Sequence, residues 1–170
     1  MNKIFALLFA LLVSLSCKNF AADLTIESPV FSGNSLIPSQ YTCDGANESP
    51  PLSWKDSSTE TQSYTLFVED PDAPGGSWDH WVLFNIPASI KQLNEGALIP
   101  QGAISGRNSW NKTGYSGPCP PSGTHRYLFK LYALNTLLNL NSTASKNEVI
   151  EAMKGHVIAN SELIGLYQKK

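Results

Sequence analysis

Three carboxylates and a histidine lie in one short stretch of this chain, Asp70–Trp81. Pro71 and Pro74 fix their own φ angles and push the residues before them toward extended geometry, so this loop should be stiffer than its two glycines suggest. Aspartate and histidine side chains can bind a charged group or orient one another. The sequence therefore predicts a preformed site, with Asp70 and His80 facing each other across one rim.

Apolar runs typical of β-strands flank this loop. Tyr64–Glu69 alternates before it and Trp81–Ile86 follows it, as in a wide β-hairpin. A third run, Tyr127–Leu134, comes directly after a proline-rich loop that ends on His125 and Arg126. If this run pairs antiparallel with the strand that ends at Asp70, its histidine lies beside that carboxylate. Two stiff loops would then share one pocket.

Other segments complete a mainly β architecture. Asp23–Phe31 alternates well enough for an edge strand, and His156–Tyr167 is apolar enough to finish a sheet. Ser145–Glu148 has the spacing of a helix capping box, and Gly155 supplies a stop signal. Several strands and one or two short peripheral helices predict an antiparallel β-sandwich.

Length and composition favour one domain and disfavour a nucleic-acid partner. The 170 residues are 42% hydrophobic and carry a formal charge of −2. No flexible linker divides the chain. The two arginines, Arg107 and Arg126, are isolated, and no basic stripe with interleaved aromatic residues occurs.

The N-terminal residues 1–22 resemble an export signal. A lysine near the start, an apolar run over Ile4–Leu15 and the small residues Ala21 and Ala22 predict cleavage before Asp23, leaving one domain over residues 23–170. The alternative is lipoprotein processing at Cys17, which would attach the protein to a membrane. We expect an exported protein, periplasmic or secreted, with lipidation the less favoured outcome.

The mature chain would keep two cysteines, Cys43 and Cys119. Because export permits disulfides and an even pair leaves no spare thiol, we expect these two residues to be bonded. Two independent buried thiols are the alternative.

Several spaced motifs occur in a fixed order along the chain: Tyr41–Gly45, Ser49–Trp54, Asp70–Pro74, Asp79–Trp81, Gly106–Trp110, Gly114–Tyr115, Gly117–Pro121 and His125–Tyr127. Together they resemble the phosphatidylethanolamine-binding protein family, and the cysteine-bearing forms resemble its bacterial Raf kinase inhibitor-like branch. The match runs from about Asp23 to the C-terminus.

This resemblance implies a Greek-key β-sandwich with a small anion pocket, filled by phosphate-like groups or phosphorylated head groups. It also implies a cis peptide before Pro74. The implied pocket residues are Asp70, Pro74, His80, Gly117, Pro118, His125 and Tyr127, with Asp72 and Trp78 at the margin. The loop between Pro74 and His80 is shorter than in animal members, so kinase regulation is not expected.

Three functional classes follow from these patterns. The leading one is a ligand-binding module for phosphoryl groups or phospholipid head groups, which could also modulate a partner protein. A metal-assisted esterase is an alternative, but no metal-ligand spacing and no nucleophile elbow occurs, so we expect no cofactor and no metal. An inhibitor of an exported or host protease or signalling protein is the third class.

Overall fold

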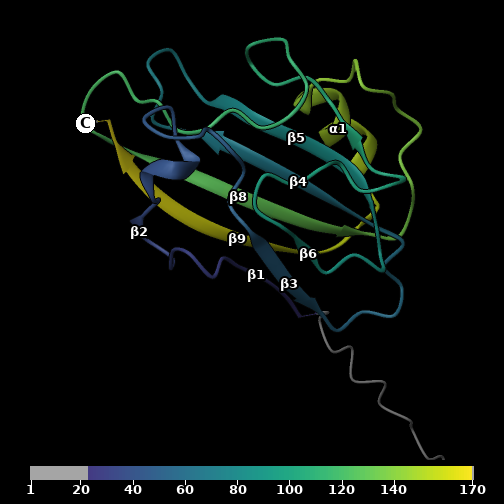
Figure 1. Ribbon diagram of the computed structural model, residues 1–170. Coiled ribbons are helices and arrows are strands. Elements are labelled where there is room, and N and C mark those ends of the chain that lie inside the picture. The colour runs from purple at the N-terminus through teal and green to yellow at the C-terminus, as the bar shows by residue number, and fades with distance from the viewer. Residues whose placement is uncertain (1–22, 170) are drawn as a thin grey trace, which may run out of the picture.

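Two β-sheets face each other in residues 23–169, the part of the chain that this computed structural model describes (Figure 1). The small sheet has the order β1 (Leu24–Glu27), β3 (Leu52–Asp56), β6 (Gln92–Leu93). The large sheet has the order β2 (Ser35–Leu36), β9 (Val157–Gln168), β8 (Thr124–Leu134), β4 (Ser63–Asp70), β5 (Trp78–Pro87), β7 (Ile104–Ser105). The predicted mainly β sandwich is confirmed. The proposed signal sequence and Cys17 lie outside the described residues.

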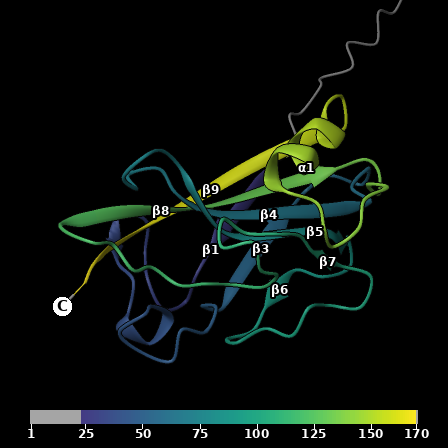
Figure 2. The same ribbon diagram turned by 90° about the horizontal axis from the view of Figure 1, so that it is seen from above.

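Two apolar layers cover the two faces of the large sheet. Figure 2 shows this sheet edge-on, with the helix α1 (Lys146–Met153) on one face and the small sheet on the other. The core between the sheets includes Tyr64, Leu66 and Val68 of β4, whereas Phe67 of the same strand belongs to the cluster under α1. Every residue of β4 is buried, because both of its faces are covered.

The helix begins where the sequence predicts. Ser145 accepts a hydrogen bond from the backbone N–H of Glu148, whose carboxylate accepts one from the backbone N–H of Ser145. This capping box satisfies backbone N–H groups that have no partner inside the helix. The amine of Lys146 then pairs with Glu69 of β4 and Asp79 of β5, at 2.5 Å from each carboxylate. The ion pairs hold the start of α1 against β4 and β5.

Antiparallel pairing brings the functional loops together. β4 pairs with β5 on one side, with Asp70 opposite Trp78, and with β8 on the other, with Glu69 opposite Leu128. The end of β4 therefore lies between the beginnings of β5 and β8, as the sequence predicts. A 3-10 turn, η1 (Ser39–Tyr41), precedes the loop that carries Cys43.

Candidate functional site

The predicted aspartate and histidine meet at the end of β4. The Nδ1 of His125 lies 2.7 Å from Oδ2 of Asp70, and both side chains are almost completely buried. The other carboxylate oxygen, Oδ1, accepts the backbone N–H of Asp72 at 2.9 Å. Asp70 is thus held on both oxygens, by a histidine from β8 and by the turn that follows its own strand. Such a carboxylate has a fixed orientation.

His80 lies close by, near the start of β5, with a fixed ring orientation. Its Nδ1 is 2.5 Å from the carbonyl oxygen of Ser116. A carbonyl oxygen only accepts, so Nδ1 must carry a proton, and the neutral ring has its lone pair on Nε2. Burial lowers the pKa of His80, against the opposing effects of the Ser116 carbonyl and the carboxylates of Asp70 and Asp79. The free protein therefore favours neutral His80.

A hollow of about 260 Å³ opens beside these residues. This volume suits a small molecule or the head group of a larger one. Its lining combines three ionisable side chains with aromatic and apolar ones: Asp70, Ala73, Pro74, Trp78, His80, Trp110, Cys119, Pro121 and Tyr127.

Two partly exposed tryptophans form one side of the hollow. Trp78 is 38% exposed and Trp110 is 41% exposed, and their rings meet edge to face with centroids 5.5 Å apart. Trp110 also packs edge to face on the His80 ring, at 5.0 Å. The amide oxygen of Asn108 holds the Trp110 loop in place by accepting the backbone N–H groups of Trp110 and Lys112.

Tyr127 contributes a buried hydroxyl without a partner. Its ring packs edge to face on His80 at 5.2 Å, and its Oη has no hydrogen-bond partner in the structure. Burial raises the pKa of Tyr127, and the nearby Asp70 carboxylate adds to the effect although it makes no hydrogen bond of normal geometry. The Asp70 carboxylate and the backbone of Cys119 lie near this hydroxyl without normal hydrogen-bond geometry, so it is poorly satisfied in the free protein.

The family model of the phosphatidylethanolamine-binding proteins matches residues 27–168. The chain belongs to this family. A UPF0098 protein of Methanothermobacter thermautotrophicus is 49% identical over 86% of this chain and 99% of its own length. A crystal structure from Chlamydia trachomatis, described as a phosphatidylethanolamine-binding protein homolog, superposes with a TM-score of 0.83 at 41% identity, covering 86% of this chain and 98% of its own. Escherichia coli YbcL, described as a new member of the mammalian family, gives 0.80 at 33% identity, with 86% and 99% covered.

Not every residue that the family resemblance implied lines the hollow of this family member. Asp70, Pro74, Trp78, His80 and Tyr127 do. The other four lie around it: Asp72, Gly117, Pro118 and His125.

Asp72 is engaged by Arg126. Its carboxylate accepts hydrogen bonds from Nη2, at 2.6 Å, and from Nε, at 2.9 Å, of that guanidinium. These bonds lower the pKa of Asp72 to about 2. Asp72 thus joins the β4–β5 loop to the start of β8 and positions the rim.

The Gly117 backbone approaches another loop rather than an open space. A Cβ on Gly117 would lie 2.4 Å from the carbonyl oxygen of Tyr41, and its N–H donates to Oδ1 of Asn47 at 2.7 Å. The family resemblance implied Gly117 as a pocket residue, whereas the structure packs it against a loop that is distant in the chain.

The cis peptide expected before Pro74 is absent: residues 23–169 contain no cis peptide bond. The chain reverses its direction here through two glycines instead. Gly75 and Gly76 have φ angles of +96° and +116°, and the N–H of Gly76 donates to the carbonyl oxygen of Ala73 at 3.1 Å. Glycine tolerates these angles, so the loop closes with a trans bond.

The expected disulfide is present. Cys43 and Cys119 are bonded, with their Cα atoms 5.4 Å apart. Because Cys119 lines the hollow, the bond ties the wall of the site to the loop after η1.

Sequence reasoning missed Trp110 as a site residue. It lies in a loop without periodic apolar spacing, but it ends the Gly106–Trp110 segment that supported the family resemblance. A partly exposed tryptophan at the end of such a segment was the available signal. Ala73, Cys119 and Pro121 were also not predicted to line the site, since each is a loop residue of ordinary type.

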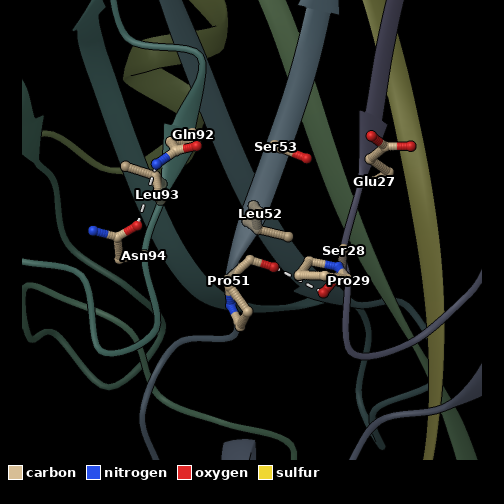
Figure 3. Close-up of a pocket in the computed structure, with 9 residues that line it drawn as sticks. All are labelled: Glu27, Ser28, Pro29, Pro51, Leu52, Ser53, Gln92, Leu93 and Asn94. Atoms are coloured by element: carbon tan, nitrogen blue, oxygen red, sulfur yellow. Dashed lines mark hydrogen bonds between the residues drawn. The ribbon is translucent and has the colours of Figure 1, made fainter.

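A larger groove of about 480 Å³ lies elsewhere, over the small sheet. Figure 3 shows Glu27, Ser53 and Gln92 side by side on β1, β3 and β6, and the strand register places them in one row. This row is the solvent-facing surface of the small sheet, and no histidine or aromatic side chain lines the groove. We therefore assign the candidate site to the smaller hollow.

Within residues 23–169, no three histidine, cysteine, aspartate or glutamate side chains gather in an arrangement suited to a metal ion. Within the same range, α1 is far too short to cross a membrane, and no other helix has the length and apolar character to do so.

Proposed function

We propose that this protein is an exported ligand-binding protein whose hollow takes a small molecule with a phosphoryl-type anion, free or as a phospholipid head group. The unpartnered hydroxyl of Tyr127 is the observation that carries the proposal. Tyr127 is one of the residues that line the hollow, and its ring packs on His80. Its hydroxyl is buried behind the lining, so a ligand oxygen that reached it would accept its hydrogen. An acceptor of this kind offsets the cost of burying the hydroxyl.

The second donor is Nε2 of His80. Because Nδ1 is bonded to the Ser116 carbonyl, Nε2 can donate only when the ring is protonated. No lysine or arginine lines the hollow. Binding of a phosphoryl anion should therefore be weak near neutral pH and coupled to uptake of a proton by His80.

Asp70 has a different role. A carboxylate repels an anion, and this one is already oriented by His125. We expect Asp70 to hold that histidine in place and to accept the ammonium of a phosphoethanolamine head group, with Trp78 and Trp110 beside it. A ligand that carries both charges should bind more tightly than phosphate alone.

The proposed location of the protein rests on its sequence. The N-terminal segment 1–22 and the paired cysteines favour export to the periplasm or beyond, and membrane attachment would require lipidation of Cys17. Modulation of a partner protein is compatible with an accessible hollow. Mass spectrometry of the mature chain tests export, with cleavage before Asp23 as the expected result.

The ligand proposal is tested by NMR titration of the protein with phosphate, phosphoethanolamine and ethanolamine. We expect phosphoethanolamine to bind most tightly and Tyr127→Phe to weaken binding of both phosphorylated ligands. Tyr132→Phe is the matched control, because Tyr132 lies on the same strand and packs against Phe67 in the layer under α1. Equal affinities for wild type and Tyr127→Phe would refute the assigned donor. If ethanolamine binds and neither phosphorylated ligand does, the hollow is a site for cations.

A further inference from the structure

One loop lies outside the hollow but is bonded at four points to residues 115–119, a segment that forms part of the wall of the hollow. This buttress loop, residues 41–47, begins at the last residue of η1. Three of its contacts are hydrogen bonds: Tyr115 Oη to the carbonyl of Tyr41 at 2.9 Å, Gly117 N–H to Oδ1 of Asn47 at 2.7 Å, and Cys43 N–H to the carbonyl of Pro118 at 3.0 Å. The fourth contact is the disulfide between Cys43 and Cys119.

The wall segment, residues 115–119, has no regular secondary structure of its own. At Gly117 its backbone comes so near the buttress loop that even a methyl group would collide with the Tyr41 carbonyl. Asn47 has a φ angle of +59°, a conformation that asparagine adopts more readily than most residues. Asn47 and the disulfide therefore fix where this wall lies.

The wall in turn fixes His80. The Ser116 carbonyl accepts from Nδ1 of His80 at 2.5 Å, and the Ser116 N–H donates to the His80 carbonyl at 3.1 Å. Cys119, three residues later, lines the hollow directly. A continuous set of bonds thus runs from the buttress loop through the wall to the ring that we assign as the anion donor.

We propose that Asn47 and the Cys43–Cys119 disulfide are positioning residues for His80, and that the ligand affinity of the hollow is linked to the redox state of this disulfide. The inference rests on the proposed function. Reduction by a dithiol such as dithiothreitol breaks the S–S bond, gives two thiols with two electrons and two protons from the reductant, and leaves the reductant as a cyclic disulfide. The wall then keeps its three hydrogen bonds to the buttress loop but loses the covalent bond.

This linkage is reciprocal. If reduction weakens ligand binding by a given factor, bound ligand must oppose reduction of the disulfide by the same factor. For this two-electron couple, a tenfold change in affinity corresponds to about 30 mV in reduction potential. Saturating phosphoethanolamine should therefore make the disulfide harder to reduce.

The test compares oxidised and reduced protein, using the nitrogen chemical shifts of His80 and the affinity for phosphoethanolamine. In the oxidised protein, neutral His80 should carry its proton on Nδ1. After reduction, and in Asn47→Ala with the disulfide intact, we expect a mixture of tautomers and roughly tenfold weaker binding. Asn34→Ala is the matched control, because Asn34 has an equivalent φ of +60° and lies beside β2 and β9.

The outcomes separate the two proposals. If the folded reduced protein and Asn47→Ala keep the oxidised tautomer and affinity, the disulfide and Asn47 do not position His80. If oxidised protein fails to bind phosphoethanolamine, the proposed function fails, and the tautomer comparison still decides the positioning role without any ligand. The double variant Cys43→Ser/Cys119→Ser should have the tautomer mixture and affinity of the reduced protein, and dithiothreitol should change neither. A change in that variant on adding the reductant would contradict the linkage.

Discussion

Proton-linked anion binding by His80 gives the sharpest prediction. The perturbation is pH, applied to the wild type and to His80→Gln, with sulfate as the ligand. Sulfate keeps the same charge across the range in which histidine titrates, so any pH dependence of binding comes from the protein. Phosphate would confuse the result, because its own second ionisation falls in this range.

The expected magnitude follows from the hydrogen bond to Ser116. Nδ1 is already a donor to that carbonyl, so an anion gains the second donor only by protonation of Nε2. Because burial keeps the pKa of His80 below its ordinary value, the free protein is largely neutral at that nitrogen near pH 7. One proton taken up per sulfate predicts an affinity that falls about tenfold for each pH unit above that pKa.

Removing the imidazole should abolish most of this dependence. A hydrogen bond to a charged group contributes about 1.5–3 kcal/mol, so His80→Gln should bind sulfate roughly 10- to 100-fold more weakly at about pH 5.5. The remaining affinity should change little with pH. His156→Gln is the control, because His156 is exposed and its ring contacts Asn135, away from the site.

Isothermal titration calorimetry at several pH values, in buffers of different ionisation enthalpy, measures both the affinity and the proton uptake. Uptake close to one proton per sulfate, absent from His80→Gln, is the expected result. An affinity that is independent of pH, or proton uptake that survives in His80→Gln, would show that another group supplies the charge.

Three further predictions concern stability. The pKa of His80 is lowered in the folded state, so the unfolded chain binds more protons below about pH 6.5. The free energy of unfolding of the wild type should therefore fall on acidification in this range. Denaturant titrations of His80→Gln should show a smaller fall. Lys146→Met should destabilise the protein by about 2 kcal/mol, because it leaves the mostly buried carboxylates of Glu69 and Asp79 with fewer partners; an unchanged denaturation midpoint would mean that these ion pairs contribute little. Cys43→Ser/Cys119→Ser should cost roughly 2–4 kcal/mol, mainly through a freer unfolded chain, and thermal melting with and without reductant measures it.

Local patterns in the sequence were sufficient for the long strands that flank the Asp70–His80 loop and for the start of the helix. The apolar runs on both sides of the Asp70–His80 loop became β4 and β5, and the Ser145 capping box starts α1. These features depend on hydrogen bonds and side-chain periodicities within a few residues, which a sequence displays directly. The proximity of His125 to Asp70 needed one further assumption, the antiparallel pairing of β4 with β8.

Tertiary contacts decided the rest of the site. Trp110 reaches His80 from an irregular loop, Arg126 engages Asp72, and Gly117 packs against the Tyr41–Asn47 loop some seventy residues earlier in the chain. The trans bond before Pro74 and the two-residue strands β6 and β7 were equally hidden. Loops carry no periodic pattern of apolar residues. Their positions depend on contacts between segments that are distant in the chain, and such a contact forms only when the fold has brought both segments together. The sequence by itself determined which side chains could bind a ligand, and the packing of three loops decided which of them line the hollow and which hold the others in position.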